Sequence, residues 1–156
     1  MRTHVSKIVR FALLLAAAGC LLPAVAEDAK TDKKKSQAAL LRGRKADEAG
    51  QRPAAIVAYT EAIQADVSNV EAWRARGQDY LAAGDRRLAQ ADLDSAVEKQ
   101  PGGAENYRAR GDFFAATGQP ERAIHDYTVA LNLKLERWEI YAMRAKAYAE
   151  EDEIEF

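Results

Sequence analysis

Residues 70–103 read VEAWRARGQDYLAAGDRRLAQADLDSAVEKQPGG, and the landmarks of this stretch return along most of the chain at one interval. An arginine recurs at positions whose numbers differ by 34, each time with a glycine or alanine beside it. Other small residues and a ring or branched residue keep the same spacing. The recurring residues are Arg42, Arg76, Arg110 and Arg144; Gly43, Gly77, Gly111 and Ala145; Gly50, Gly84 and Gly118; Ala55, Ala89 and Ala123; Tyr59, Leu93 and Tyr127; and Ala62, Ala96 and Ala130. A constant period of this size predicts a repeat protein.

The small positions predict two antiparallel helices in each repeat. Trp73, Gly77 and Tyr80 fall at helical spacing on one face of the first helix. Small residues at Gly77 and Ala89 allow two helices to approach closely, and larger side chains fill the space around that contact. Gly84 tolerates the left-handed backbone that ends a helix, so the chain is expected to turn back there.

This spacing resembles that of the tetratricopeptide repeat, whose period is 34 and whose pattern runs Trp, Leu-Gly, Tyr, Ala, Phe, Ala and Pro. The resemblance covers roughly three quarters of the chain. It implies an all-α fold, in which tandem antiparallel helix pairs stack into a short right-handed α-solenoid. The structural repeat positions that it implies are Gly43, Trp73, Gly77, Tyr80, Ala89, Ala96, Gly111, Ala123 and Ala130.

The repeat spacing also predicts the boundaries. The repeats are expected at residues 36–69, 70–103 and 104–137, with residues 138–156 as a partial fourth repeat, a capping helix and an acidic tail. Ser36 is expected to cap the first helix and Asp85 the helix after Gly84. The first repeat is atypical, because Ala39 and Ala46 stand where later repeats have aromatic rings. A terminal repeat with no earlier neighbour is expected to differ in this way.

The segment 1–26 has the pattern of a secretion signal. A basic start precedes an apolar run from Phe11 to Leu22, and residues 23–26 supply a helix break and a small-x-small cleavage pattern. Alternatively, residues 17–20 resemble a bacterial lipobox in which Cys20 carries the lipid. A transmembrane anchor is a third interpretation, which the short apolar run disfavours. Residues 27–35 are read as a charged linker. We expect an exported protein, either periplasmic or lipid-anchored in the bacterial envelope, that meets a membrane only if Cys20 is lipidated.

The composition argues against several classes of function. After residue 26 the chain has 20 basic against 24 acidic side chains, a net charge of −4 with histidine neutral, which is not typical of a nucleic-acid-binding protein. The same stretch has one histidine, His125, and no cysteine. Thiol–histidine catalysis and a zinc site built from these residue types are therefore excluded. We expect no enzyme activity, no cofactor and no metal site.

An arginine beside the glycine is unusual for the family, which most often has leucine there. An aspartate follows two of these arginines at one fixed interval, as Asp92 after Arg76 and Asp126 after Arg110. Antiparallel packing would bring each pair together, so the spacing predicts a salt bridge inside each of these repeats. The first repeat has Ala58 in the aspartate position, and no such pair is expected there.

The free face of the first helix in each repeat is the candidate binding surface. In tetratricopeptide proteins this face lines a concave groove for a partner peptide, which implies the groove residues Leu40, Arg44, Glu71, Arg74, Gln78, Glu105, Arg108, Asp112, Glu139 and Lys146. Arg74 and Arg108 stand one repeat apart and can meet successive acidic groups or carbonyls of a peptide. The opposite reading stays open, because each arginine has a glutamate one helical turn before it, and the charges can neutralise each other as a solvated face.

The sequence predicts a class of function without naming a partner. We expect a non-enzymatic scaffold or adaptor of the bacterial cell envelope that binds a peptide segment of another protein in the groove. The family's carboxylate-clamp variant is not supported, since Gln78 and Asp112 stand where asparagines are expected. Two alternatives are self-association as a homodimer through the terminal helix and Trp138, and an accessory subunit of an envelope enzyme that acts on peptidoglycan.

Overall fold

The computed structural model describes residues 32–133 and 137–154, and their secondary structure is entirely helical. A helix over residues 32–48 comes first. The helices that follow are α2 (Arg52–Ala65), α3 (Val70–Ala82), α4 (Arg86–Lys99), α5 (Ala104–Ala116), α6 (Pro120–Asn132) and α7 (Trp138–Ile154). The all-α prediction is confirmed, and the helix expected after Gly84 runs from Arg86 to Lys99.

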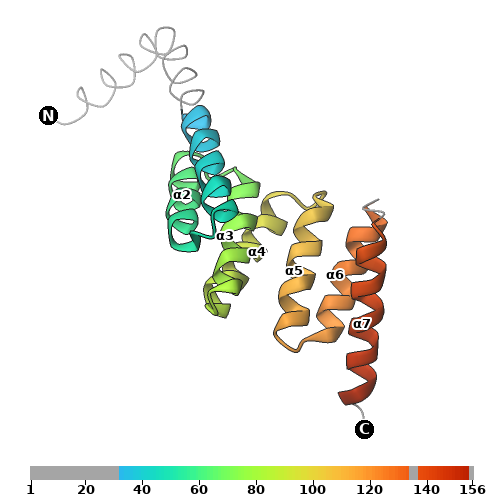
Figure 1. The fold of residues 1–156 in the computed structure, drawn as a ribbon. Helices are drawn as coiled ribbons and strands as arrows, with labels where there is room; N and C mark the ends of the chain where they lie inside the picture. Colours follow the sequence, from blue (N-terminus) through green and yellow to red (C-terminus); the bar gives the residue numbers. More distant parts are fainter. Residues whose placement is uncertain (1–31, 134–136, 155–156) are drawn as a thin grey trace, which may run out of the picture.

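The helices stack as successive antiparallel pairs (Figure 1). We call the helix over residues 32–48 together with α3, α5 and α7 the first helices of the four repeats, and α2, α4 and α6 the second helices. Within a repeat α3 packs on α4, and α5 packs on α6. The first helices also contact one another, α3 with α5 and α5 with α7. The first helices of neighbouring repeats therefore lie side by side.

Each turn inside a repeat ends in a glycine with positive φ. Gly50, Gly84 and Gly118 have φ values of 70°, 85° and 72°. Only glycine adopts this left-handed conformation at little cost, and it lets the chain reverse directly after the helix. After Gly84, the side chain of Asp85 accepts a hydrogen bond of 3.1 Å from the backbone N–H of Leu88 and caps α4, as the sequence predicts.

The glycine beside the recurring arginine is set by the contact between the two helices of a repeat. A Cβ atom on Gly111 would lie 2.7 Å from the ring of Tyr127, and one on Gly77 would lie 2.9 Å from Cγ of Leu93. A Cβ on Gly43 would likewise meet the ring of Tyr59. Larger residues at these positions would force the helices apart. The close approach predicted from the spacing is confirmed.

The core forms two clusters of buried residues. One joins the later repeats and contains Ala89, Leu93, Ala109, Phe113, Phe114, Ala123, Tyr127, Ile140 and Ala147. The other lies in the first repeat and its junction with the second, and contains Ala39, Leu40, Ala55, Tyr59, Ala62, Ile63 and Ala72. The predicted packing residues Ala96 and Ala130 are fully buried, whereas Trp73 and Tyr80 lie at the edges of the clusters.

The start of the first helix differs from the sequence-based prediction. Residues 32–35, expected to belong to a linker, are already helical, so Ser36 is not an N-cap. Ser36 is instead fully buried, where Oγ donates to the carbonyl of Ala62 at 2.7 Å and accepts from Nδ2 of Asn69 at 2.8 Å. A small hydroxyl suits this site because it satisfies both partners in little space. The predicted signal sequence and Cys20 lie outside the described residues.

No helix in the described part of the chain is both long enough and apolar enough to cross a bilayer.

Candidate functional site: the inner face

Three positions of each first helix form a surface that we call the inner face. They recur at the repeat period and come from helices that lie side by side, so they make three rows across the repeats. The rows are Gln37, Glu71, Glu105 and Glu139; Leu40, Arg74, Arg108 and Ala142; and Arg44, Gln78, Asp112 and Lys146. This set includes every groove residue expected from the sequence.

The first half of the inner face is a chain of charged contacts between repeats. Arg44 of the first repeat forms a salt bridge with Glu71 of the second. Arg74 lies 3.6 Å from the same carboxylate and donates a hydrogen bond of 3.2 Å to Oδ1 of Asn106 in the third repeat. Each basic group therefore already has a partner on a neighbouring helix as well as any partner on its own helix.

The second half is centred on Arg108. Its guanidinium donates to Glu105 at 2.8 Å and to Asp112 at 2.7 Å, and Glu105 also pairs with Arg137 at 3.1 Å. Burial opposes ionisation of Glu105, but the hydrogen bond from Arg108 and the nearby arginine charges outweigh it and lower the pKa of Glu105. Burial likewise opposes the charge of Arg108, whose pKa is nevertheless raised by Glu105 and Asp112. Arg108 is held by two carboxylates.

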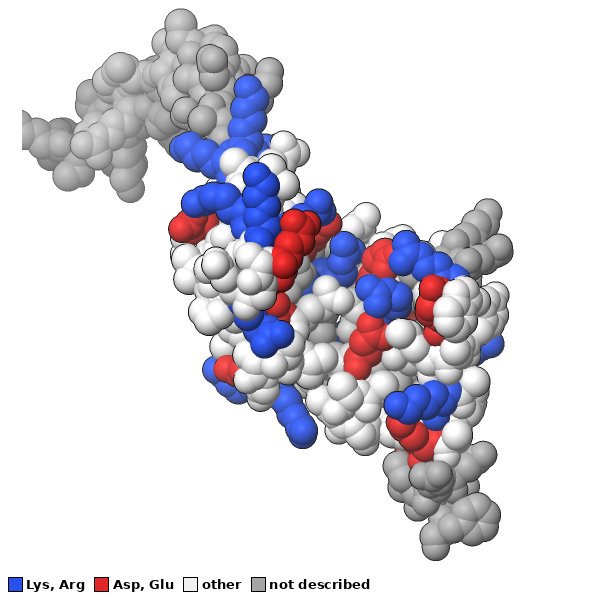
Figure 2. All heavy atoms as spheres, viewed as in Figure 1, with Lys and Arg blue, Asp and Glu red and all other residues white. Residues whose placement is uncertain are grey.

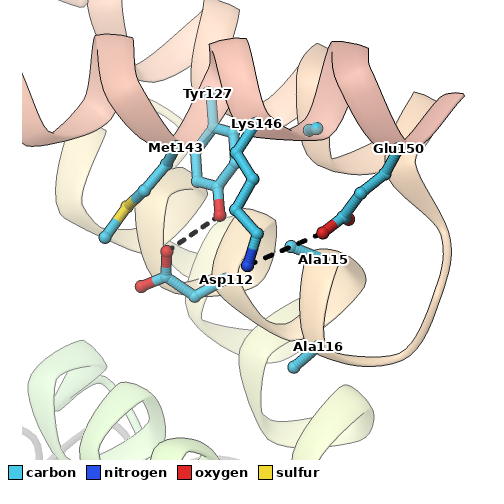
Figure 3. Close-up of a pocket in the computed structure, with 8 residues that line it drawn as sticks. Asp112, Ala115, Ala116, Tyr127, Met143, Lys146 and Glu150 are labelled. Carbon is cyan, nitrogen blue, oxygen red and sulfur yellow. Dashed lines mark hydrogen bonds and ion pairs between the residues drawn. The ribbon is translucent and has the colours of Figure 1, made fainter. Parts of the chain in front are cut away.

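Between α5 and α7 the inner face is indented, and we call this cavity of about 320 Å³ the α5–α7 hollow. Figure 3 shows Asp112 rising from α5 toward Met143 and Lys146 of α7. The residues around the hollow are Asp112, Ala115, Ala116, Tyr127, Met143, Lys146, Ala147 and Glu150. Small alanines leave the space open, and the polar groups stand at its edge. A cavity of this kind accepts an apolar side chain flanked by polar contacts.

The polar groups of the hollow are paired but remain partly accessible. The hydroxyl of Tyr127 donates to Asp112 at 3.0 Å, and Nζ of Lys146 lies 3.6 Å from Glu150 (Figure 3). Burial raises the pKa of Asp112 in spite of the neighbouring Arg108 charge. Burial and the Asp112 carboxylate also raise the pKa of Tyr127, so its hydroxyl stays a donor. Lys146 is exposed and free to turn toward a ligand.

The face of the molecule seen in Figure 2 carries mixed charge over most of the stack. Basic and acidic side chains lie next to one another there, and basic side chains gather over the start of the first helix (Figure 2). A surface of this kind does not attract a ligand by net charge alone. Shape and specific pairing are left as the sources of selectivity.

The structure distinguishes among the groove residues expected from the sequence. Arg74, Gln78, Glu105, Arg108 and Asp112 are half-buried on the inner face, whereas Glu139 and Lys146 are exposed on α7. Leu40 needs a partial correction, because its side chain packs in the buried cluster of the first repeat and only its edge lines a hollow beside Glu71. An apolar residue in a row of charged ones is drawn into the core by its hydrophobicity.

Several groups that shape this face were missed from the sequence. Asn106 is fully buried, and its Nδ2 donates to the carbonyls of Ala96 and Gln100 while Oδ1 accepts from Arg74. A signal was present, since Asn106 is the polar member of a repeat position that otherwise holds alanine or isoleucine. Met143 gave no such signal, because its place in the hollow depends on how α7 packs.

A pair of carboxyl groups lies at the junction of the first two repeats. Asp79 is buried, its Oδ2 has no hydrogen-bond partner among the described groups, and the nearest basic atom, Nε of Arg52, is 3.8 Å from Oδ1. Burial first, and then the nearby Asp47 carboxylate, raise the pKa of Asp79 to about 7. Asp47 accepts a hydrogen bond of 2.5 Å from the hydroxyl of Tyr59. A proton on Asp79 can be donated to Asp47, which relieves the repulsion between the two carboxylates.

The face opposite the inner face carries the recurring arginines, and the two predicted salt bridges are confirmed. Arg76 donates from Nε and Nη2 to both oxygens of Asp92, at 2.7 and 2.9 Å. Arg110 does the same with Asp126, at 2.7 and 3.0 Å. The hydrogen bond to Asp126 raises the pKa of Arg110 despite partial burial. Bidentate pairs of this kind join the two helices of a repeat.

The described residues offer no group of three or more His, Cys, Asp and Glu side chains placed to hold a metal ion. His125 is exposed, and its Nδ1 lies 3.1 Å from Oδ1 of Asp126. That carboxylate is already held by Arg110, so the histidine is at the edge of a structural salt bridge.

Comparison with known proteins places the fold. No family model matches the chain, and no curated protein is similar in sequence. Solved structures do match: the first TPR domain of Spaghetti (RPAP3) bound to the HSP90 peptide SRMEEVD has a TM-score of 0.71 at 25% identity, over 75% of this chain and 93% of that one. The first TPR domain of human RPAP3, solved by NMR, has a TM-score of 0.74 at 24% identity, over 78% and 95% of the two chains.

A third match is to part of a much larger protein. An O-GlcNAc transferase from Thermobaculum terrenum has a TM-score of 0.70 at 28% identity, and the similarity covers 74% of this chain but 22% of that one. The helical pairs, the constant repeat spacing and these likenesses agree. The chain has the tetratricopeptide-repeat fold, an α-solenoid of stacked helix pairs.

Proposed function

We propose that the protein is an interaction module that binds a peptide segment of another protein on its inner face. The observation that carries this proposal is the α5–α7 hollow, which opens on that face between two first helices and combines small apolar side chains with polar groups. A solved domain with the same fold and 25% identity is bound to an HSP90 peptide, which supports peptide binding by this architecture.

We infer a contact point for the peptide that lies away from Arg74 and Arg108. Both arginines are engaged by groups of the protein itself, so a ligand would have to displace Glu71, Asn106, Glu105 or Asp112 to reach them. An apolar side chain can enter the α5–α7 hollow without such an exchange, and the Lys146–Glu150 pair at its edge is solvent-exposed and 3.6 Å apart. We therefore infer that an apolar side chain of the peptide enters the hollow and that its flanking polar groups meet Lys146 and Glu150.

The test fills the hollow with a large side chain. Ala116→Trp places an indole at an exposed position on its edge, and Ala91→Trp adds the same group to an exposed position of α4 as a matched control. Crosslinked co-purification from the native host with wild type and both variants should give a partner that is lost only with Ala116→Trp. Synthetic segments of that partner should then bind purified wild type and Ala91→Trp equally, and Ala116→Trp about tenfold or more weakly. Equal binding by all three proteins would contradict the proposal.

We also propose that the protein works in the bacterial envelope as a non-enzymatic adaptor, which rests on the signal-like pattern in residues 1–26. Fractionation of cells that carry Cys20→Ala separates the two forms of export. A lipid-anchored protein would leave the membrane fraction in this variant, whereas a protein cleaved after Ala26 would be unchanged. A partner that acts on peptidoglycan would make the module an accessory subunit.

Self-association through α7 stays as a second candidate, supported by the exposed side chains of Trp138 and Tyr141. Light scattering would show a dimer, and Trp138→Ala would return it to a monomer. A monomeric wild-type protein would contradict this candidate.

A further inference from the structure

The outer face of α7 carries the residues that receive a second helix in the earlier repeats. Tyr141, Arg144 and Tyr148 stand in the same repeat positions as Tyr107, Arg110 and Phe114 of α5. In the third repeat the position of Tyr148 is occupied by a phenylalanine that is 1% exposed under α6. Tyr141 and Tyr148 are both 49% exposed, because no helix in the described chain covers this side of α7.

Arg144 occupies the same repeat position as Arg76 and Arg110. Those two arginines pair with an aspartate of the second helix, and the described chain has no such aspartate for Arg144. Nη1 of Arg76 donates to Thr60, and Nη1 of Arg110 donates to Asp94, in each case on the second helix of the preceding repeat. Nη1 of Arg144 makes the equivalent contact with Thr128 at 3.4 Å. Nε and Nη2 of Arg76 donate to Asp92, and the same two atoms of Arg110 donate to Asp126. No carboxylate of residues 32–133 or 137–150 lies within ion-pair distance of Arg144.

The rings beside the arginine are also kept in α7. Arg76 lies over Trp73 and Tyr80, at 5.2 and 5.7 Å from the ring centroids. Arg144 lies 5.7 Å from the ring of Tyr141, with Tyr148 one turn further along the helix. Rings on either side of Arg76 hold its guanidinium in place, and the ring of Tyr141 does so on one side of Arg144.

The first repeat shows the opposite combination. It has its second helix, α2, yet alanines stand at 39, 46 and 58, in place of both rings and of the aspartate. Its Arg42 turns to the exposed Glu61. The first repeat therefore forms a helix pair without the two rings and the aspartate. By contrast, α7 has the arginine and the two rings but no second helix in the described chain.

We propose that the outer face of α7 docks an amphipathic helix of a partner protein, which presents an aspartate or glutamate to Arg144. The template is the second helices of the protein itself, in which alanine, aspartate and alanine recur as Ala89, Asp92 and Ala96. Ala145 replaces the glycine of the other repeats, and a Cβ at Gly77 would lie 2.9 Å from Leu93. The docked helix therefore carries a small residue after its acidic one, where α4 has leucine.

The probe is a 14-residue peptide with the sequence of α4 carrying Leu93→Ala, and its matched control carries Asp92→Asn as well. Each is titrated into the full chain and followed by NMR at the rings of Tyr141 and Tyr148. We expect the acidic peptide to bind about tenfold or more tightly than the Asp92→Asn control. Arg144→Met should remove this difference, and Lys146→Met, on the inner face of α7, should preserve it.

Equal affinities of the two peptides for wild type would overturn the proposal, as would a difference that survives Arg144→Met. Dimerisation of the chain that buries Tyr141 and Tyr148 and blocks the peptide would also overturn it, in favour of a second copy as the occupant. The readout concerns the outer face alone, so these results are independent of binding in the α5–α7 hollow.

Discussion

Asp126 in the third repeat and Asp79 at the junction of the first two repeats are both buried carboxyl groups, but their surroundings differ. Asp126 is 1% exposed and receives two hydrogen bonds from Arg110. Asp79 is 9% exposed, has no arginine within hydrogen-bond distance and lies beside another carboxylate. Both carboxyl groups are buried, so the difference lies in the neighbour: Arg110 stabilises the charged form of Asp126, whereas Asp47 disfavours the charged form of Asp79. The same fold thus contains a buried salt bridge, Arg110 with Asp126, and a carboxyl pair, Asp79 with Asp47, that favours a bound proton.

The largest expected effect on stability comes from removing Arg110 from its salt bridge with Asp126. Arg110→Ala should lower the free energy of unfolding by about 3–5 kcal/mol, because it leaves Asp126 buried and charged. Urea denaturation followed by circular dichroism measures the loss. Arg110→Met combined with Asp126→Ala, which copies the alanine of the first repeat, should recover most of it. A loss below about 1 kcal/mol in Arg110→Ala would show that burial does not make this pair important.

A smaller effect, with a pH dependence, is expected at Asp79. Its folded-state pKa lies above the unfolded value, so the folded state binds more protons between about pH 4 and 7 and stability falls as pH rises through that window. Asp79→Asn should stabilise the protein at pH 8 by about 1–3 kcal/mol, since the amide donates to Asp47 without needing a proton. Urea midpoints at pH 5 and pH 8 should differ for wild type and much less for the variant.

The control for this pH experiment is Asp85→Asn, an exposed position where asparagine caps a helix as well as aspartate. It should keep the wild-type difference between the two pH values. If Asp79→Asn also kept that difference, the proton would reside on another group.

The smallest effect is expected at the arginine of the first repeat. Arg42 and Glu61 are 62% and 47% exposed, and alanines stand at positions 39 and 46, where the later repeats have aromatic rings. Arg42→Ala should lower the free energy of unfolding by less than about 1 kcal/mol, as is usual for an exposed ion pair. Comparing its urea midpoint with that of Arg110→Ala tests one sequence position in two environments. Similar losses in the two variants would refute the argument from burial.

Part of the candidate site was predictable from residue spacing. The inner-face rows follow from the repeat period, and the salt bridges of Arg76 and Arg110 follow from the fixed interval between each arginine and the aspartate on the second helix of its repeat. The contacts between repeats were not predictable in this way. Arg44 meets Glu71, and Arg74 meets Asn106, across a stacking geometry that no local spacing encodes.

The sequence by itself determined the repeat length, the helix pairs, the turns at positive-φ glycines and the small residues where helices touch. Each of these depends on contacts within a single repeat, which a periodic sequence reproduces along the chain. Only the tertiary structure decided that Leu40 is buried, that Asp79 lacks a cation, and that a cavity opens between α5 and α7. Those features depend on how one repeat is placed on the next, because burial and electrostatic surroundings are set by all the elements that pack around a group.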